Sequence, residues 1–169
     1  MSRLFLPLVL LLAAGCGRRQ AAAGEERVQT LDGLVLRQSE NGRPSWTLRA
    51  RLAVLREDQK KAVLSDPAME FLRDGKVVSR VTAAAGEVDT ETRDVRLSQS
   101  VALDSLDDAS RLTTEELLFS SARQRFRTDR EVLVKRPDAT LRGSGLEATP
   151  DLSEIRVFNQ RTDIKERPR

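Results

Sequence analysis

The sequence predicts an all-β protein built from stacked hairpins, and three observations support this prediction. Apolar and polar residues alternate along several segments, which is typical of strands with one buried face. Turn residues separate these segments, and a unit of strand, turn and strand recurs about every 30 residues. With 169 residues, the chain is long enough for one ordinary domain with a hydrophobic core.

The clearest strand is predicted within residues 45–55, which read SWTLRARLAVL. Apolar residues occupy every second position of this segment: Trp46, Leu48, Ala50, Leu52 and Val54. A helix is the alternative, because Leu48, Leu52 and Leu55 also recur at helical spacing. The alternation has more matches and the turn-forming sequence ENGRP precedes it, so the strand is favoured.

A hairpin is predicted within residues 62–83. Asp74 and Gly75 form a turn-forming pair between two apolar runs. Met69 and Phe71 share one face of the first run. Pro67 fits only the start of a strand or an edge strand, because proline lacks the amide hydrogen that a central strand needs.

Residues 82–103 and 113–134 repeat one pattern. In this register Val88 matches Phe119, Val95 matches Phe126, Val101 matches Val132, and Leu103 matches Val134. A weaker third copy includes Leu146 and Ile155, and residues 46–71 read as a divergent earlier copy. Thr113 and Glu116 imitate a helix capping box, but the register with the strand-like copy favours a strand. A hairpin cannot bury its inner face alone, so stacking predicts two facing antiparallel sheets.

Alternate residues of these strands are expected to line the space between the sheets. They either fill a core or line a groove for an apolar ligand such as an acyl chain. The candidates are Trp46, Leu48, Met69, Phe71, Val88, Val101, Leu103, Phe119, Phe126 and Val132.

Composition excludes several classes of function. The chain has no histidine and no tyrosine, so the commonest general base and the Ser-His and Cys-His arrangements are absent. One cysteine forms neither an internal disulfide nor a cysteine-based zinc site. We therefore expect no enzyme activity, no catalytic residues, no metal and no cofactor. Charged residues make up 33% of the chain but the net charge is only +3, which argues against nucleic-acid binding.

The N-terminus is predicted to be a lipoprotein signal peptide over residues 1–15. The apolar run before Cys16 is too short to span a bilayer and ends in small residues, as before an acylated cysteine. The usual large aliphatic residue three places before the cysteine is replaced by Ala13. Cleavage elsewhere and an uncleaved anchor are the alternatives. Residues 16–30 are expected to form a flexible tether, 31–160 the β domain, and 161–169 a C-terminal tail.

The segment LRGSGLEA, residues 141–148, lies near the C-terminal end of the predicted stack. Gly143 and Gly145 favour a bulge or a close backbone approach. Ser144 between them has no histidine to activate it, so a turn or bulge is preferred to a nucleophile. The end strands of such a stack leave backbone groups that another chain can pair with.

Several motifs, in this order, resemble the LptC family of lipopolysaccharide export proteins. They include WTLRA (residues 46–50), LSDPAMEF (64–71), AAAGEVD (83–89), VRLSQSVAL (95–103) and LRGSGLEA (141–148). The resemblance implies a twisted β-jellyroll that receives lipopolysaccharide from the inner-membrane LptB/LptF/LptG transporter. The resemblance further implies that the jellyroll passes the lipid to LptA, with the acyl chains between the sheets and Gly143 and Gly145 near the LptA edge.

The same resemblance implies a periplasmic protein held at the inner membrane, here by acylated Cys16 in place of the transmembrane helix of many family members. Gly17 is not the aspartate that retains some lipoproteins at that membrane, so the outer membrane stays an alternative. A scaffold lipoprotein that binds protein edges without lipid is the second functional hypothesis. A hydrolase using Asp89 and Glu115 has too little support to propose.

Overall fold

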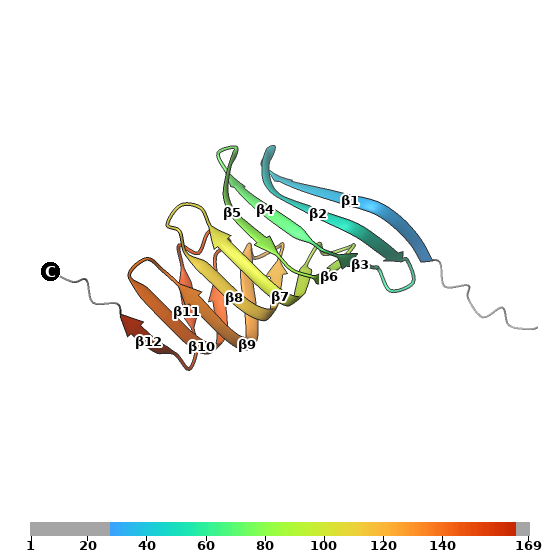
Figure 1. Cartoon of the computed structure of the whole chain (residues 1–169). Helices are drawn as coiled ribbons and strands as arrows, with labels where there is room; N and C mark the ends of the chain where they lie inside the picture. Colours follow the sequence, from blue (N-terminus) through green and yellow to red (C-terminus); the bar gives the residue numbers. More distant parts are fainter. Residues whose placement is uncertain (1–27, 165–169) are drawn as a thin grey trace, which may run out of the picture.

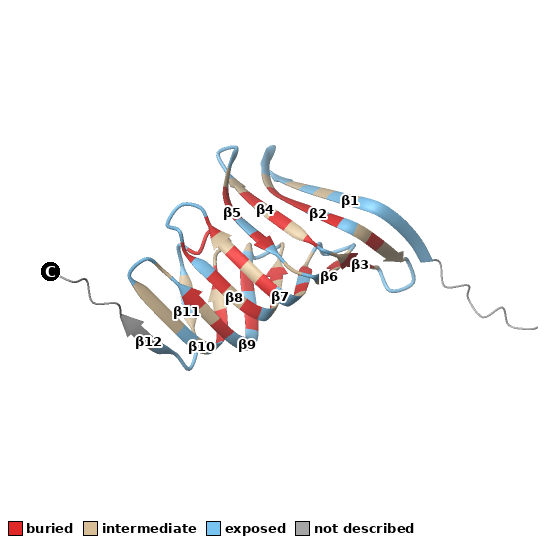
Figure 2. Cartoon of the chain, in the orientation of Figure 1, coloured by how far each residue is buried: buried red, intermediate tan, exposed pale blue. Residues whose placement is uncertain are grey.

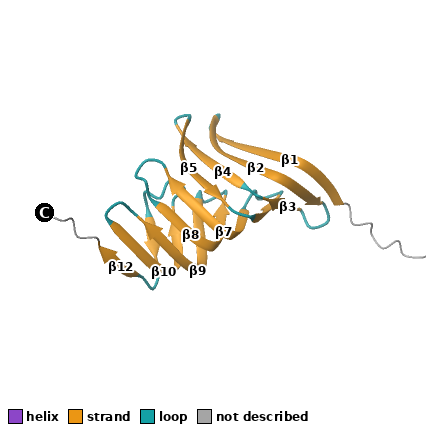
Figure 3. Ribbon diagram, in the orientation of Figure 1, coloured by secondary structure: helices purple, strands orange, loops and turns teal. Residues whose placement is uncertain are grey.

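The computed structural model describes residues 28–164, which form antiparallel strands joined by turns (Figures 1 and 3). The all-β prediction is confirmed. The strands are β1 (Val28–Glu40), β2 (Arg43–Arg56), β3 (Lys61–Ser65), β4 (Ala68–Arg73), β5 (Lys76–Thr82), β6 (Ala85–Asp89), β7 (Val95–Ser105), β8 (Arg111–Ser120), β9 (Arg125–Lys135), β10 (Ala139–Ala148), β11 (Ile155–Val157) and β12 (Arg161–Ile164).

The strands form two facing layers because the long strands bend in the middle and contribute one half to each. The first half of β2 pairs with β4 and its second half pairs with β3. Likewise, the first half of β7 pairs with β6 and its second half with β5. We call the layer that contains β4, β5 and β12 layer A, and the layer that contains β3, β6 and β11 layer B. The two facing antiparallel sheets of the prediction are therefore present, joined through the bent strands.

Local irregularities produce the bends. The β7–β8 register shifts between Ser98 and Val101, and both residues within this shift, Gln99 and Ser100, have positive φ angles of 65° and 57°. A bulge of this kind bends a strand and increases its twist. Pro67 lies between β3 and β4, at the start of a strand as predicted. Gly145 supplies the corresponding irregularity in β10 with a φ of 89°.

Two-residue turns connect two of the hairpins. Asn41 and Gly42 join β1 to β2, with φ angles of 50° and 76°. Asp74 and Gly75 join β4 to β5, with φ angles of 51° and 76°. Two successive positive φ angles define the type I′ turn that matches the twist of paired strands. The predicted Asp-Gly hairpin is confirmed, and β2 and β8 are strands where the sequence also allowed helices.

Strand pairing extends the domain at both ends relative to the predicted boundaries. Strand β1 begins at Val28, within the expected tether of residues 16–30, because Val28 already pairs with Arg56. Strand β12 lies in the expected tail of residues 161–169 because Arg161 pairs with Arg142 of β10. The signal peptide and Cys16 lie outside the described residues.

The core fills the space between the layers, where buried and exposed residues alternate along the strands (Figure 2). The outer faces are covered by charged side chains. Glu70, for example, accepts hydrogen bonds from Arg80 at 2.7 Å and Arg49 at 3.0 Å. The hydrogen bond from Arg80 and the neighbouring charges lower the pKa of Glu70 although partial burial opposes the shift. This arrangement explains how a chain with so many charged residues also has an apolar interior.

Candidate functional site

The interior between the layers brings together all ten predicted lining residues. Each is at least 96% buried, since none is more than 4% exposed. They come from six strands, β2, β4, β6, β7, β8 and β9, as the alternation along those strands predicts. Their placement in the interior agrees with the sequence, and their contact with lipid stays a prediction.

The middle of the interior is filled by aromatic side chains. Phe119 lies at ring-centroid distances of 5.0 Å from Phe71, 5.2 Å from Phe126 and 6.0 Å from Trp46. Phe71 and Phe126 are 5.4 Å apart. Three of these pairs are edge-to-face and the Phe119–Phe126 pair is tilted, and aromatic contacts at such distances stabilise a core beyond the burial of apolar area. This region is therefore a packed core, which is the plainer of the two alternatives left by the sequence.

An apolar cavity of about 260 Å³ opens between the layers beside β1. We call this site the N-terminal mouth. Its apolar wall consists of Leu34, Leu36, Trp46, Leu55, Ala62 and Val88, and Arg37 and Arg93 also line it. The indole Nε1 of Trp46 is buried and has no hydrogen-bond partner among residues 28–164. Asp89 and Thr90 complete the lining, so the mouth combines an apolar wall with two cationic side chains and one carboxylate.

Of the apolar residues of the N-terminal mouth, the sequence predicted only Trp46 and Val88 as lining residues. Leu34 and Leu36 were missed because Val35 lies between them, which hides the alternation in β1. Leu36 pairs with Leu48 of β2, so its position next to the core follows from the strand register. The spacing of Leu34 and Leu36 was the signal that could have revealed them.

A polar contact lies beside the N-terminal mouth, where one of its lining arginines bonds to β1. The guanidinium of Arg93, in the turn after β6, donates a hydrogen bond to the side-chain oxygen of Gln38 on β1. Asp89 precedes this turn and accepts hydrogen bonds from the amides of Thr92 and Glu91, which lower its pKa. Asp89 therefore orders the turn that carries Arg93.

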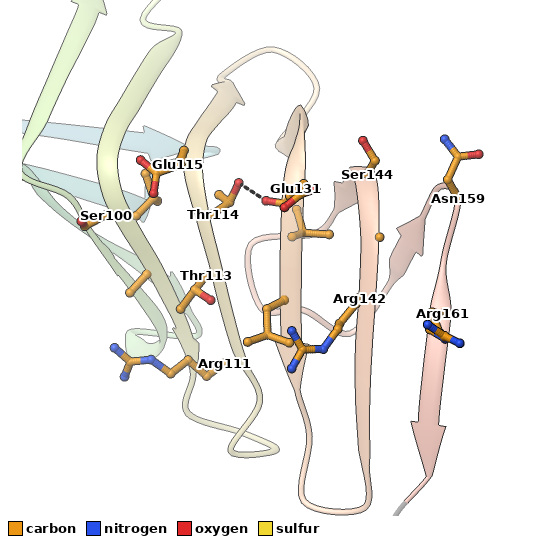
Figure 4. Close-up of a pocket in the computed structure, with 15 residues that line it drawn as sticks. Ser100, Arg111, Thr113, Thr114, Glu115, Glu131, Arg142, Ser144, Asn159 and Arg161 are labelled. Atoms are coloured by element: carbon orange, nitrogen blue, oxygen red, sulfur yellow. Dashed lines mark hydrogen bonds between the residues drawn. The ribbon is translucent and has the colours of Figure 1, made fainter.

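The two carboxylates considered for a hydrolase do not share a hollow. Asp89 lines the N-terminal mouth, whereas Glu115 lines a separate hollow of about 820 Å³ on the outer face (Figure 4). Figure 4 shows Arg111, Arg142 and Arg161 towards one end of this outer hollow, away from Glu115. The outer hollow is broad and open and carries both acidic and basic side chains, so it suits an acyl chain less well than the N-terminal mouth.

Gly143 and Gly145 lie on β10, one strand inside the C-terminal edge, and their contact with a partner stays a prediction. The amide of Ser144 donates to the carbonyl of Phe158, and the amide of Phe158 donates to the carbonyl of Gly145. Strands β11 and β12 pair with β10 on either side of this contact. The C-terminal edge of the domain is therefore formed by β11 and β12, because they cover β10.

Within residues 28–164, no group of histidine, cysteine and acidic side chains is arranged to hold a metal ion. The same part of the chain contains no helix long and apolar enough to cross a membrane.

Comparison with known proteins agrees with this architecture. No curated protein sequence matches the chain. Among solved structures, the chain resembles a crystal structure of LptH from Pseudomonas aeruginosa, described as the LptA-homologous periplasmic component of the lipopolysaccharide transport device. The match has a TM-score of 0.55 and 13% sequence identity, and covers 73% of this chain and 95% of the LptH chain. At this identity the likeness shows the fold alone.

A sequence model of one family, described as "Lipopolysaccharide-assembly, LptC-related", matches residues 18–164. This range includes every described strand and both layers. The chain therefore belongs to the LptC-related family of lipopolysaccharide-assembly proteins.

Proposed function

We propose that this protein is a non-enzymatic lipid-transfer subunit. It accepts lipopolysaccharide from the inner-membrane LptB/LptF/LptG transporter and passes it to LptA across the periplasm. Family membership and the LptA-like fold support a role in lipopolysaccharide transport. The direction and the partners of transfer are part of the proposal.

The proposal also includes the attachment to the membrane. Cys16 is acylated after removal of residues 1–15, and its acyl chains hold the protein at the periplasmic face of the inner membrane. The polar segment between Cys16 and β1 then acts as the tether. This arrangement keeps the β domain beside the membrane from which the lipid is taken.

The observation that carries the proposal is the N-terminal mouth. Its apolar wall is continuous with the buried core, because Trp46 belongs to both. An acyl chain that enters here replaces contact with water by contact with Leu34, Leu36 and Leu55. Arg37 and Arg93 provide donors suited to the phosphate groups of a charged glycolipid. Deeper insertion requires the core side chains to move apart.

A photo-crosslinking amino acid placed at Leu36 is expected to capture lipopolysaccharide in cells. Leu36 lines the mouth, whereas the neighbouring Val35 is 50% exposed and does not line it. Replacement of Val35 is therefore the matched control, on the same strand and at the same distance from the membrane anchor. Equal capture at both positions would contradict binding in the mouth.

The scaffold function is the second candidate, and the filled core favours it. A protein that binds neighbouring proteins by its strand edges needs no space between its layers. This candidate expects no copurifying lipid and no crosslink at Leu36. Under this candidate, changes in the edge strands β1 or β12 weaken partner binding, and no variant captures lipid because none is held.

A further inference from the structure

The loop of residues 149–154 joins β10 to β11, the last strands of layer B at the C-terminal side of the domain. We call this segment the gate loop. Leu152 at its tip is fully buried and belongs to the hydrophobic core. Its φ of +59° is rare for a bulky residue, since the left-handed conformation normally favours glycine. A leucine is thus held in an unfavourable backbone conformation in which its side chain fills the interior.

Hydrogen bonds within the gate loop make it a preformed unit. The amide of Leu152 donates to the carbonyl of Thr149 at 3.0 Å, and the amide of Thr149 donates to the carbonyl of Glu154 at 3.0 Å. Asp151 accepts hydrogen bonds from the amide and the hydroxyl of Ser153, at 3.1 Å and 2.8 Å. The loop is therefore a compact turn held by its own hydrogen bonds.

The gate loop bridges the free ends of the two layers. The loop starts from the end of β10 that lies in layer B. Its side-chain contacts are with residues at the ends of β4 and β9, which lie in layer A. Arg73, the last residue of β4, forms an ion pair with Asp151, whose side chain is only 9% exposed. The guanidinium of Arg136, after β9, donates to the carbonyl of Leu152 at 3.2 Å. These two arginines hold the loop in its closed position.

The structure around the gate loop includes buried polar atoms with unused hydrogen-bonding capacity. The hydroxyl of Ser79 is fully buried and the Nε of Arg136 is also buried, and neither has a hydrogen-bond partner in the described part of the chain. Ser79 pairs with Ser105, which immediately precedes the turn that contains Asp107. Asp107 in turn lies 3.4 Å from Arg73. An unpaired buried donor costs free energy, and the Nε of Arg136, which holds the loop, is such a donor.

We propose that residues 149–154 form a gate at the C-terminal end of the interior, in which Leu152 occupies the place of a lipid acyl chain. Lipid that advances from the N-terminal mouth displaces Leu152 and releases the loop from Arg73 and Arg136. The two ends of the interior then have different roles, with admission at the mouth and release controlled at the gate. This inference rests on the proposed lipid-transfer function.

Hydrogen exchange measured by mass spectrometry tests the gate in the full chain, held in detergent micelles with and without purified rough-type lipopolysaccharide. We expect the lipid to slow exchange in residues 34–37 and 46–48 and to accelerate exchange in residues 149–154. Slower exchange at the mouth with unchanged exchange in the loop would overturn the gate and leave the lipid-transfer function standing. Unchanged exchange in both regions would overturn both.

Two variants separate the gate from a merely structural loop. Asp151→Asn keeps the shape of the side chain but removes its charge towards Arg73, and we expect exchange in residues 149–154 to rise about tenfold without lipid. Leu152→Gly suits the backbone conformation while removing the side chain from the interior, so lipopolysaccharide should protect the inner residues of β9 and β10 more strongly than in the wild type.

Asp104→Asn is the matched control, because it removes an exposed ion pair with Arg111 at 2.9 Å on the outer face. It should change neither loop exchange nor lipid protection, and unchanged exchange in residues 95–105 in all variants confirms an intact fold. The gate would be overturned by two results together. Lipopolysaccharide would protect β9 and β10 of Leu152→Gly no more than those of the wild type, and residues 149–154 of Asp151→Asn would exchange at the wild-type rate.

Discussion

Phe119→Ala is expected to lower the free energy of unfolding by about 3–5 kcal/mol, the usual cost of removing a buried aromatic side chain. Phe119 is 1% exposed and its ring contacts three other aromatic residues across both layers. Truncation leaves a cavity that the surrounding strands cannot close, since each is fixed by hydrogen bonds to its neighbours. Urea unfolding followed by the fluorescence of Trp46 measures the loss.

Leu106→Ala is the control for this experiment, because Leu106 is 55% exposed in the turn between β7 and β8. It should change the free energy of unfolding by no more than about 0.5 kcal/mol. A loss below about 1 kcal/mol for Phe119→Ala would contradict a packed interior and favour an open groove.

Gly143→Val is expected to detach β11 and β12 from β10 and to destabilise the domain by about 1–3 kcal/mol. A Cβ atom at this position would lie 2.3 Å from a methyl group of Val157 and 2.5 Å from the carbonyl oxygen of Phe158. The carbonyl cannot move without breaking its hydrogen bond to the amide of Ser144. Faster hydrogen exchange in residues 155–164 would report the detachment.

Ser144→Ala is the control for Gly143→Val, because Ser144 is the next residue on the same strand and is exposed. It should leave exchange in residues 155–164 unchanged. Wild-type exchange in Gly143→Val would show that β11 does not lie against Gly143. The result also bears on partner binding, since detaching β11 and β12 exposes the backbone of β10 to another chain.

The sequence predicted the fold where its signal was local and periodic. The alternation around Trp46 identified β2, and the match between Val88 and Phe119 placed two strands that indeed face the same interior. The Asp74-Gly75 turn was predictable because its residue types suit positive φ angles. Each of these features depends on a few neighbouring residues.

The site was less predictable because it depends on contacts between distant segments. Nothing in the sequence distinguishes a filled interior from an open one, since the same alternation serves both. Leu152 gave no signal because it is a single apolar residue in a polar turn, and it is buried only because the folded loop places it in the hydrophobic core. Strand β12 was missed because Arg161 begins a polar segment whose strand conformation comes from pairing with β10.

The central claim is that acyl chains enter between the layers at the N-terminal mouth. Trp46 is the only tryptophan in the chain and lines this mouth, so its fluorescence reports directly on the site. The measurement is a titration of the full chain with lipid A whose acyl chains carry bromine, a contact quencher, compared with unbrominated lipid A. We expect saturable quenching of Trp46 by the brominated lipid alone. Saturable binding of both lipids without a difference in quenching would contradict the claim.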